Sequence, residues 1–146
     1  MLSFNLPLQT ANSPRQGVSP PMGKAKVLYI EDNPDNMTLV KRVLEIEGYE
    51  VIQAKTGTEG LAKAAENRPD LIITDINLPD IDGYEITNTL KNSADTAHIP
   101  VIAMTANVMK KDRESVFEAG CDGYISKPID VDELPEQIEN FLKGKV

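Results

Sequence analysis

The sequence is poor in the residues that build disulfides, zinc clusters and imidazole sites. It contains one cysteine, Cys121, one histidine, His98, and no tryptophan. A single cysteine rules out an intramolecular disulfide and a cysteine zinc cluster, and it suits a reducing cytoplasm. A single histidine rules out any site that needs two imidazoles, and the polar stretch around it predicts a surface loop. Any metal site is therefore expected to use oxygen ligands.

Long apolar runs and an excess of positive charge are also missing. No run approaches the roughly 20 residues that are needed to span a bilayer. The 15 Lys and Arg residues stand against 23 Asp and Glu residues, which gives a formal net charge of -8. So acidic a surface repels nucleic acid and anionic membranes. We expect a cytoplasmic protein that binds neither.

Residues 1–23 differ in composition from the rest of the chain. They hold four of the ten prolines, and Arg15 is the one charged residue before Met22. Such a segment buries too little apolar surface to offset its ordering entropy. It also lacks the basic start and long apolar core of a signal peptide. We expect a disordered extension over residues 1–23 and one domain over residues 24–146, with Met22 as a candidate natural start.

From residue 26 onward, apolar strand-like runs alternate with helical patterns. Strands are expected at residues 27–30, 51–52, 71–73, 101–104 and 124–125. Helices are expected at residues 34–47, 84–90, 110–118 and 134–142, with a further helix through residues 61–65 that ends near Pro69. Asn33 before Pro34 is typical of a helix start, and Gly48 of a helix end. Five strands alternating with five helices predict the α/β class, with a doubly wound parallel sheet covered on both faces.

Polar residues stand at the expected carboxyl ends of these strands. In order along the chain they are Glu31 and Asp32, Asp75, Thr105, and Ser126 with Lys127. Sites in open parallel sheets lie outside these ends, where the strand order switches. Three converging carboxylates repel one another unless a cation holds them, and oxygen ligands favour a hard ion such as Mg²⁺. Asp75 is then a competent nucleophile toward phosphorus, with Lys127 and Thr105 available for the phosphoryl oxygens.

Four short motifs, in this order and spacing, make residues 26–143 resemble the receiver domain of response regulators. They are YIEDN at residues 29–33, DINLP at 75–79 followed by DG at 82–83, MTA at 104–106, and KP at 127–128. The resemblance implies a flavodoxin-like receiver fold with five parallel strands in the order 2-1-3-4-5. It also implies the following roles for individual residues.

The acidic residues match the phosphorylation and metal positions of that family. Asp75 matches the phosphoacceptor. Glu31 and Asp32 match the acidic pair that binds Mg²⁺, and Asp32 is the more direct ligand. Asn77 matches the residue whose backbone carbonyl completes the protein ligands, while its side chain influences dephosphorylation.

The remaining motif residues match the parts of the family that respond to phosphorylation. Thr105 matches the switch hydroxyl, and Tyr124 matches the switch aromatic that turns inward. Lys127 matches the lysine that pairs with the phosphoryl group, and its bond to Pro128 is expected to be cis. Ala106 matches the small residue that leaves the phosphoryl group accessible.

The resemblance implies a signalling domain, not an enzyme with an external substrate. A histidine kinase or histidine phosphotransfer protein would donate the phosphoryl group to Asp75, with Mg²⁺ as cofactor. Phosphorylation would switch a partner-binding face formed by the fourth helix, the fifth strand and the fifth helix. The chain ends at Val146 without an output domain, which suggests a stand-alone receiver or one excised from a hybrid kinase.

Two other classes fit the sequence less well. A phosphatase with an aspartate nucleophile would place a second acid two residues later, where this chain has Asn77. A nucleotide-binding or purely structural module is disfavoured because neither Gly-x-Gly-x-x-Gly nor Gly-x-x-x-x-Gly-Lys occurs. A degenerate receiver that is not phosphorylated is disfavoured because every acidic position is filled.

Overall fold

A computed structural model describes residues 25–106, 114–115 and 117–143. The extension predicted over residues 1–23 and most of the fourth helix predicted over residues 110–118 lie outside the described residues. Within that helix, residues 114–115 and 117–118 are described and are helical. Over the described ranges, no helix has the length and apolar character needed to cross a membrane.

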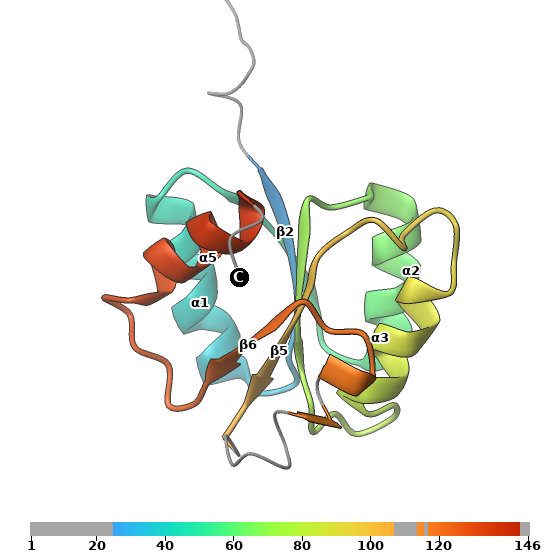
Figure 1. Ribbon diagram of the computed structural model, residues 1–146. Helices are drawn as coiled ribbons and strands as arrows, with labels where there is room; N and C mark the ends of the chain where they lie inside the picture. The colour runs from blue at the N-terminus through green and yellow to red at the C-terminus, as the bar shows by residue number, and fades with distance from the viewer. Residues whose placement is uncertain (1–24, 107–113, 116, 144–146) are drawn as a thin grey trace, which may run out of the picture.

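Five parallel strands form a single sheet through the middle of the molecule (Figure 1). They are β2 (Lys26–Ile30), β3 (Glu50–Ala54), β4 (Leu71–Asp75), β5 (Val101–Thr105) and β6 (Gly123–Ser126). Their spatial order is β3-β2-β4-β5-β6, which confirms the predicted order 2-1-3-4-5. The strand order switches between β2 and β4, so the carboxyl ends of these two strands flank the position where open sheets bind ligands.

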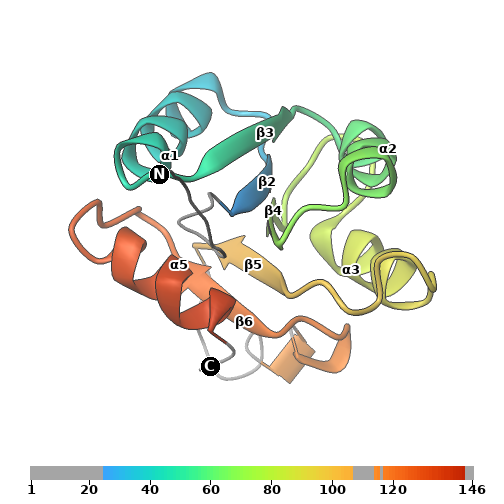
Figure 2. The same cartoon turned by 90° about the horizontal axis from the view of Figure 1, so that it is seen from above.

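Helices cover both faces of the sheet, as Figure 2 shows from above. On one face lie α1 (Pro34–Ile46) and α5 (Leu134–Leu142), and on the other lie α2 (Gly57–Asn67) and α3 (Gly83–Lys91). Alternate residues of β2 enter opposite cores: Val27 and Tyr29 pack with α1 and α5, and Leu28 and Ile30 pack with α2 and α3. This alternation follows from the pleat of a strand. Both faces of the strand are buried, as the continuous apolar run predicts.

The first helix begins and ends where the sequence predicts. The Asn33 side chain accepts a hydrogen bond of 3.0 Å from the backbone N–H of Asn36 and caps α1. Gly48 follows the helix with a φ of +95°, a conformation that glycine adopts without steric cost. Because α1 begins two residues after Asp32, the connection that carries the two acids is short and held at both ends.

Candidate functional site

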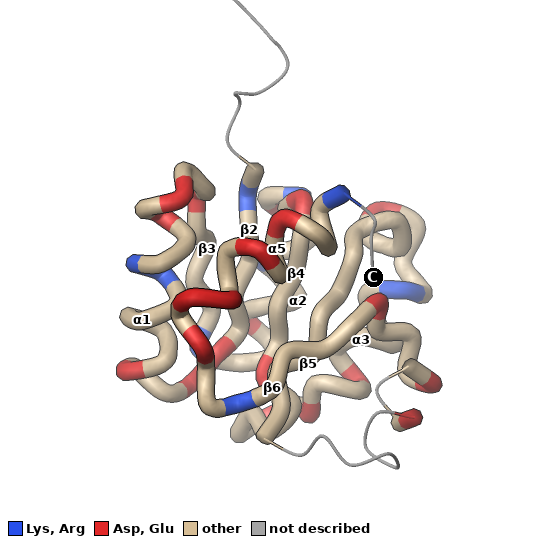
Figure 3. The backbone as a smooth tube through the Cα atoms, turned by 60° about the vertical axis from the view of Figure 1, so that its left-hand side comes forward, with Lys and Arg blue, Asp and Glu red and all other residues tan. Residues whose placement is uncertain are grey.

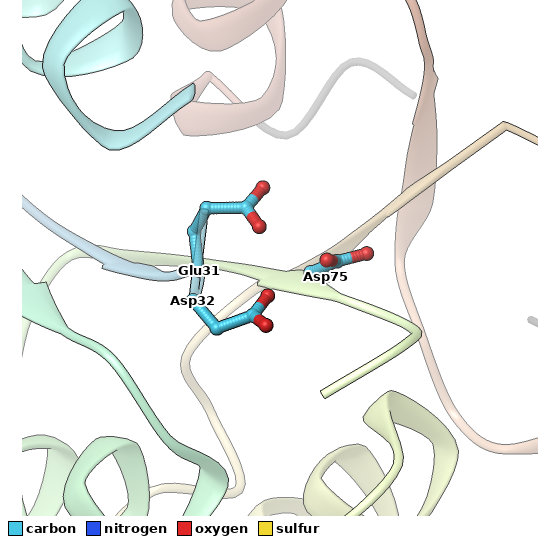
Figure 4. A group of neighbouring side chains, drawn as sticks. All are labelled: Glu31, Asp32 and Asp75. Carbon is cyan, nitrogen blue, oxygen red and sulfur yellow. The ribbon is translucent and has the colours of Figure 1, made fainter. Parts of the chain in front are cut away.

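Three carboxylates converge at the carboxyl ends of β2 and β4. Glu31 and Asp32 directly follow β2, and Asp75 is the last residue of β4. One oxygen of each lies within 4.8 Å of the others, and Figure 4 shows the three groups directed toward a common space. Glu31 is 1% exposed and Asp75 is 4% exposed, whereas Asp32 lies at the surface. The cluster is therefore buried on one side and open to solvent at Asp32.

Lys127, which directly follows β6, places a positively charged side chain at the site. The pairing of Thr105 with Ser126 and a 2.8 Å bond from the Lys127 N–H to the Thr105 carbonyl set Lys127 beside the end of β5. Its Nζ atom lies 3.3 Å from Glu31 Oε1 and 3.3 Å from Asp75 Oδ2. The bond between Lys127 and Pro128 is cis. The cluster thus holds one ammonium group, which contacts two of the three carboxylates, and it keeps an excess of negative charge.

Glu31 accepts hydrogen bonds from several protein groups besides Lys127. Its Oε1 atom accepts from the Tyr29 hydroxyl at 2.9 Å and from Asn36 Nδ2 at 3.5 Å, and its Oε2 atom accepts from the Asn33 N–H at 3.2 Å. Burial raises the pKa of Glu31, but the donors and the nearby Lys127 charge outweigh burial and hold its pKa below the usual value. Glu31 is therefore ionised at neutral pH.

Unlike the environment of Glu31, the environment of Asp75 favours the protonated carboxyl group. Burial, followed by the charge of Glu31, raises the pKa of Asp75 to about 6. Lys127 and the Asn77 N–H, which donates to Asp75 Oδ1 at 3.3 Å, act in the opposite direction. A cation placed among the carboxylates would favour the ionised form of Asp75.

The donor set fits a magnesium ion. All of the candidate side-chain ligands are carboxylate oxygens, and they lie close enough together to share one ion. Mg²⁺ prefers such oxygen ligands and keeps several of its waters, and the exposure of Asp32 leaves room for them. Asn77 is exposed two residues after Asp75, at the same edge of the sheet.

The loop after β4 is fixed from two sides. A Cβ atom on Gly83 would lie 2.8 Å from the Asp75 carbonyl oxygen, so the loop returns tightly to the strand end. The Asp80 carboxylate accepts bonds of 2.8 and 2.9 Å from the N–H groups of Gly57 and Thr58, and one of 2.7 Å from the Thr58 hydroxyl. The donors from Thr58 and Gly57 lower the pKa of Asp80 well below its usual range. Asp80 thus ties the loop to the start of α2.

Thr105 lies on the strand next to that of Asp75, and Tyr124 lies one strand further away. Thr105 ends β5 and is buried, and Tyr124 lies on β6, half-buried and paired in register with Ala103. The Tyr124 ring meets the Phe117 ring edge-to-face, with centroids 6.3 Å apart. A cavity of about 330 Å³ opens beside this pair, lined by Phe117, Asp122, Gly123, Tyr124 and Phe141.

The structure thus brings together Glu31, Asp32, Asp75 and Lys127, with Thr105 at the end of the neighbouring strand. Ala106 follows Thr105 and is exposed. Sequence reasoning missed Tyr29. Its signal was a hydroxyl-bearing aromatic two residues before Glu31, hence on the same face of the strand.

Sequence reasoning also missed Asp80. It gives no local signal, because its partners Gly57 and Thr58 stand 23 and 22 residues away in the sequence.

Known proteins share sequence similarity with most of this chain. The response regulator receiver domain family matches residues 27–139. Over 116 residues the chain is 47% identical to the polar-differentiation response regulator DivK of Brucella anthropi, covering 80% of this chain and 94% of that protein.

Solved structures share the fold of this chain. The chemotaxis response regulator CheY4 of Vibrio cholerae aligns with a TM-score of 0.77 and 29% identity, over 80% of this chain and 98% of CheY4. The receiver domain of the sensor histidine kinase PA1611 from Pseudomonas aeruginosa PAO1 aligns with a TM-score of 0.76 and 32% identity, over 83% of this chain and 99% of that one. That receiver domain was crystallised with a magnesium ion coordinated in its active-site cleft.

Proposed function

This chain belongs to the response regulator receiver domain family, and from that premise we propose that Asp75 accepts a phosphoryl group in a Mg²⁺-dependent reaction. The donor is the phosphohistidine of a histidine kinase or of a histidine phosphotransfer protein in a phosphorelay. The observation that carries the proposal is the setting of Asp75, with two further carboxylates within 4.8 Å and the Lys127 ammonium at 3.3 Å.

The transfer is a substitution at phosphorus. A carboxylate oxygen of Asp75 forms the new P–O bond, the P–N bond of the donor breaks, and its electron pair remains on the imidazole nitrogen. Lys127 pairs with one phosphoryl oxygen, and the Thr105 hydroxyl donates to another. Glu31, Asp32, Asp75 and the Asn77 carbonyl would hold Mg²⁺, which would balance charge on the phosphoryl oxygens.

The Asp75 phosphate is also the point at which the signal ends. Ala106 leaves the phosphoryl group open to water, and hydrolysis of the acyl phosphate returns the carboxylate and inorganic phosphate. The Asn77 side chain beside it influences this rate. Receiver domains are signalling domains, and the chemistry that we propose for this one acts on its own Asp75.

Phosphorylation of Asp75 changes the conformation of the protein at the β6 edge of the sheet. The phosphate adds about −1.5 to −2 charge and strong acceptors, which draw Thr105 inward and make room for Tyr124 to follow. We propose that an effector protein docks on the face of the fourth helix, β6 and α5, where the cavity beside Tyr124 lies.

The charge on this side of the molecule supports a protein partner. Acidic residues line α5 and the segment before it, as Figure 3 shows: Asp130, Asp132, Glu133, Glu136 and Glu139. Such a surface repels nucleic acid and anionic membranes. The single cysteine fits the cytoplasm, where we place the protein.

Incubation with acetyl phosphate and Mg²⁺, followed by intact mass measurement, tests the proposal. We expect a gain of one phosphoryl group that disappears in Asp75→Asn and in excess chelator. Asp95→Asn is a matched control, because Asp95 is exposed and lies 3.8 Å from Arg68, away from the three acids. A folded wild-type protein that gains no mass, or an Asp75→Asn variant that still does, contradicts the proposed function.

A further inference from the structure

We propose that Tyr29 is a positioning residue of the acidic site, whose hydroxyl holds the Glu31 carboxylate so that Lys127 can leave Glu31 for the phosphoryl group. This inference rests on the proposed function of the same site. It assigns a mechanistic part to a residue of the hydrophobic core that stands in the YIEDN motif but was given no role from the sequence.

Core packing holds the Tyr29 ring in place independently of its hydrogen bond to Glu31. It is 0% exposed and packs in the core beneath α1 and α5, so close packing leaves its ring little freedom. Since Tyr29 and Glu31 are two residues apart, their side chains leave the chain on the same face. The hydroxyl lies 2.9 Å from Glu31 Oε1 and 3.4 Å from Met104 Sδ. A hydroxyl has one hydrogen to donate, and an ionised carboxylate is a much stronger acceptor than a thioether.

Tyr29 and Lys127 donate to the same oxygen. The Lys127 ammonium lies 3.3 Å from Glu31 Oε1, and at the same time 3.3 Å from Asp75 Oδ2. When Lys127 turns to a phosphoryl group on Asp75, its contact with Glu31 has to lengthen or break. Glu31 is 1% exposed, so water cannot replace the lost partner. A buried carboxylate that loses a charged partner is destabilised unless its other donors hold it.

The hydroxyl of Tyr29 is one of the donors that remain. After Lys127 moves, Oε1 keeps its bonds to the Tyr29 hydroxyl at 2.9 Å and to Asn36 Nδ2 at 3.5 Å, and Oε2 keeps its bond to the Asn33 N–H. Tyr29 makes the shorter bond to Oε1 and is held in the core, so it is the stronger of the two remaining donors to that oxygen. Glu31 therefore keeps its orientation, and Lys127 is released to act on the phosphoryl group.

A purely structural role for Tyr29 makes a different prediction. If only the ring matters, phenylalanine in its place retains full function, because it keeps the ring and all of its packing. The variant Tyr29→Phe removes the hydroxyl alone. The matched control is Tyr49→Phe, which deletes the same atom from a half-buried tyrosine that packs at the edge of the same core.

The first measurement is Mg²⁺ binding by calorimetry. Loss of a group that orients a metal ligand costs at least roughly 10-fold in metal affinity, so we expect a drop of about that size in Tyr29→Phe and none in Tyr49→Phe. At saturating Mg²⁺ we further expect slower phosphorylation by acetyl phosphate, since Glu31 then retains Lys127. The thermal midpoint of each variant checks that it is folded.

The second measurement needs no metal. The Asn33 amide donates to Glu31 Oε2, so its ¹⁵N–¹H resonance reports where the carboxylate lies. In the metal-free protein we expect this resonance to shift in Tyr29→Phe and to stay in place in Tyr49→Phe. This readout distinguishes the two proposals. Wild-type protein without Mg²⁺ binding counts against the proposed function, whereas an unmoved Asn33 resonance counts against Tyr29 alone.

A double variant tests whether Tyr29 acts through Glu31. In a Glu31→Gln background, Tyr29→Phe should have no further effect on Mg²⁺ affinity, because the charged acceptor is already gone. A loss of the same size in both backgrounds overturns the assignment, as does a Tyr29→Phe protein that binds Mg²⁺ like the wild type.

Discussion

The ammonium nitrogen of Lys127 lies 3.3 Å from Oδ2 of Asp75. The two residues come from strands that are not neighbours, since β5 separates β4 from β6 in the sheet. Their side chains are 20% and 6% exposed, so water screens the pair only in part. The parallel sheet thus places a cation beside the proposed nucleophile without any sequence proximity.

Lys127→Ala should slow phosphorylation by acetyl phosphate about 100-fold or more, the usual cost of removing a charged group that stabilises a transition state. Lys127→Arg should recover part of the rate, because it keeps the charge but not the compact ammonium geometry. A time course of mass gain measures both. The control is Lys143→Ala at the end of α5, where the side chain is exposed. An unchanged rate in Lys127→Ala removes this lysine from the mechanism.

Mg²⁺ affinity should fall as the pH is lowered through the pKa of Asp75, which is about 6. The ion binds the ionised carboxylate and has to displace the proton. One unit below the pKa, roughly one molecule in eleven carries the ionised form, so affinity at pH 5 should be about 10-fold weaker than near pH 7.5. Calorimetric titrations across this range measure the slope. A pH-independent affinity excludes Asp75 as a ligand.

The same pKa affects the stability of the metal-free protein. The folded-state pKa of Asp75 is about 6, above the value of about 3.9 in an unfolded chain. Between these values the folded state binds more protons than the unfolded state, so the contribution of Asp75 to stability falls as the pH rises. Urea unfolding in chelator should show wild type losing stability relative to Asp75→Asn between about pH 4 and pH 6. A constant difference between the two proteins contradicts the raised pKa.

Gly83→Ala should disturb the end of β4. The added Cβ atom would meet the Asp75 carbonyl oxygen at 2.8 Å and Ile76 Cα at 2.9 Å, and backbone atoms cannot move aside without moving the strand end. Overpacking of this kind costs about 1–3 kcal/mol. We expect lower unfolding free energy together with slower phosphorylation.

The comparison variant for Gly83→Ala is Gly60→Ala, whose added Cβ atom has side-chain atoms of Ile30 as its three nearest contacts. Ile30 packs in the core with α2 and α3, so this variant should lose stability without displacing the end of β4. Phosphorylation in Gly60→Ala should therefore be closer to that of the wild type than phosphorylation in Gly83→Ala. Equal rates in the two variants refute a specific effect of Gly83 on Asp75.

Asp80→Ala should loosen the loop that carries Asn77, because it removes all of the acceptors that tie this loop to the start of α2. We expect a lower thermal midpoint and weaker Mg²⁺ binding. Thr58→Val removes only the hydroxyl donor and leaves both backbone donors, so its effects should be smaller. Thermal scans and titrations of the two variants measure this order, and the reverse order refutes it.

The sequence predicted the sheet and the proposed phosphorylation site more fully than the contacts around them. The continuous apolar strands, the cap at Asn33 and the glycine at position 48 are local signals, and each depends on backbone preferences that act over a few residues. The convergence of Asp75 with Asp32 and Lys127 followed from one topological rule about the carboxyl ends of parallel strands.

The contacts that sequence reasoning missed are side-chain choices made in three dimensions. Tyr29 looks like any core aromatic until the position of Glu31 is known, and Asp80 looks like a turn residue until α2 is placed beside it. The unequal burial of Glu31 and Asp32 is likewise invisible in the sequence, since it depends on which side of the chain faces α1.

The edge-to-face contact between Phe117 and Tyr124 has a consequence for how sharply this domain responds. Aromatic pairs of this geometry contribute about 0.5–1.5 kcal/mol beyond the area that they bury. The proposed inward rotation of Tyr124 would forfeit that contact, so Phe117 would set a threshold that the phosphate has to exceed. Under that proposal the residue at position 117 would tune the response: a smaller side chain would lower the threshold and raise background output without any change to the three carboxylates.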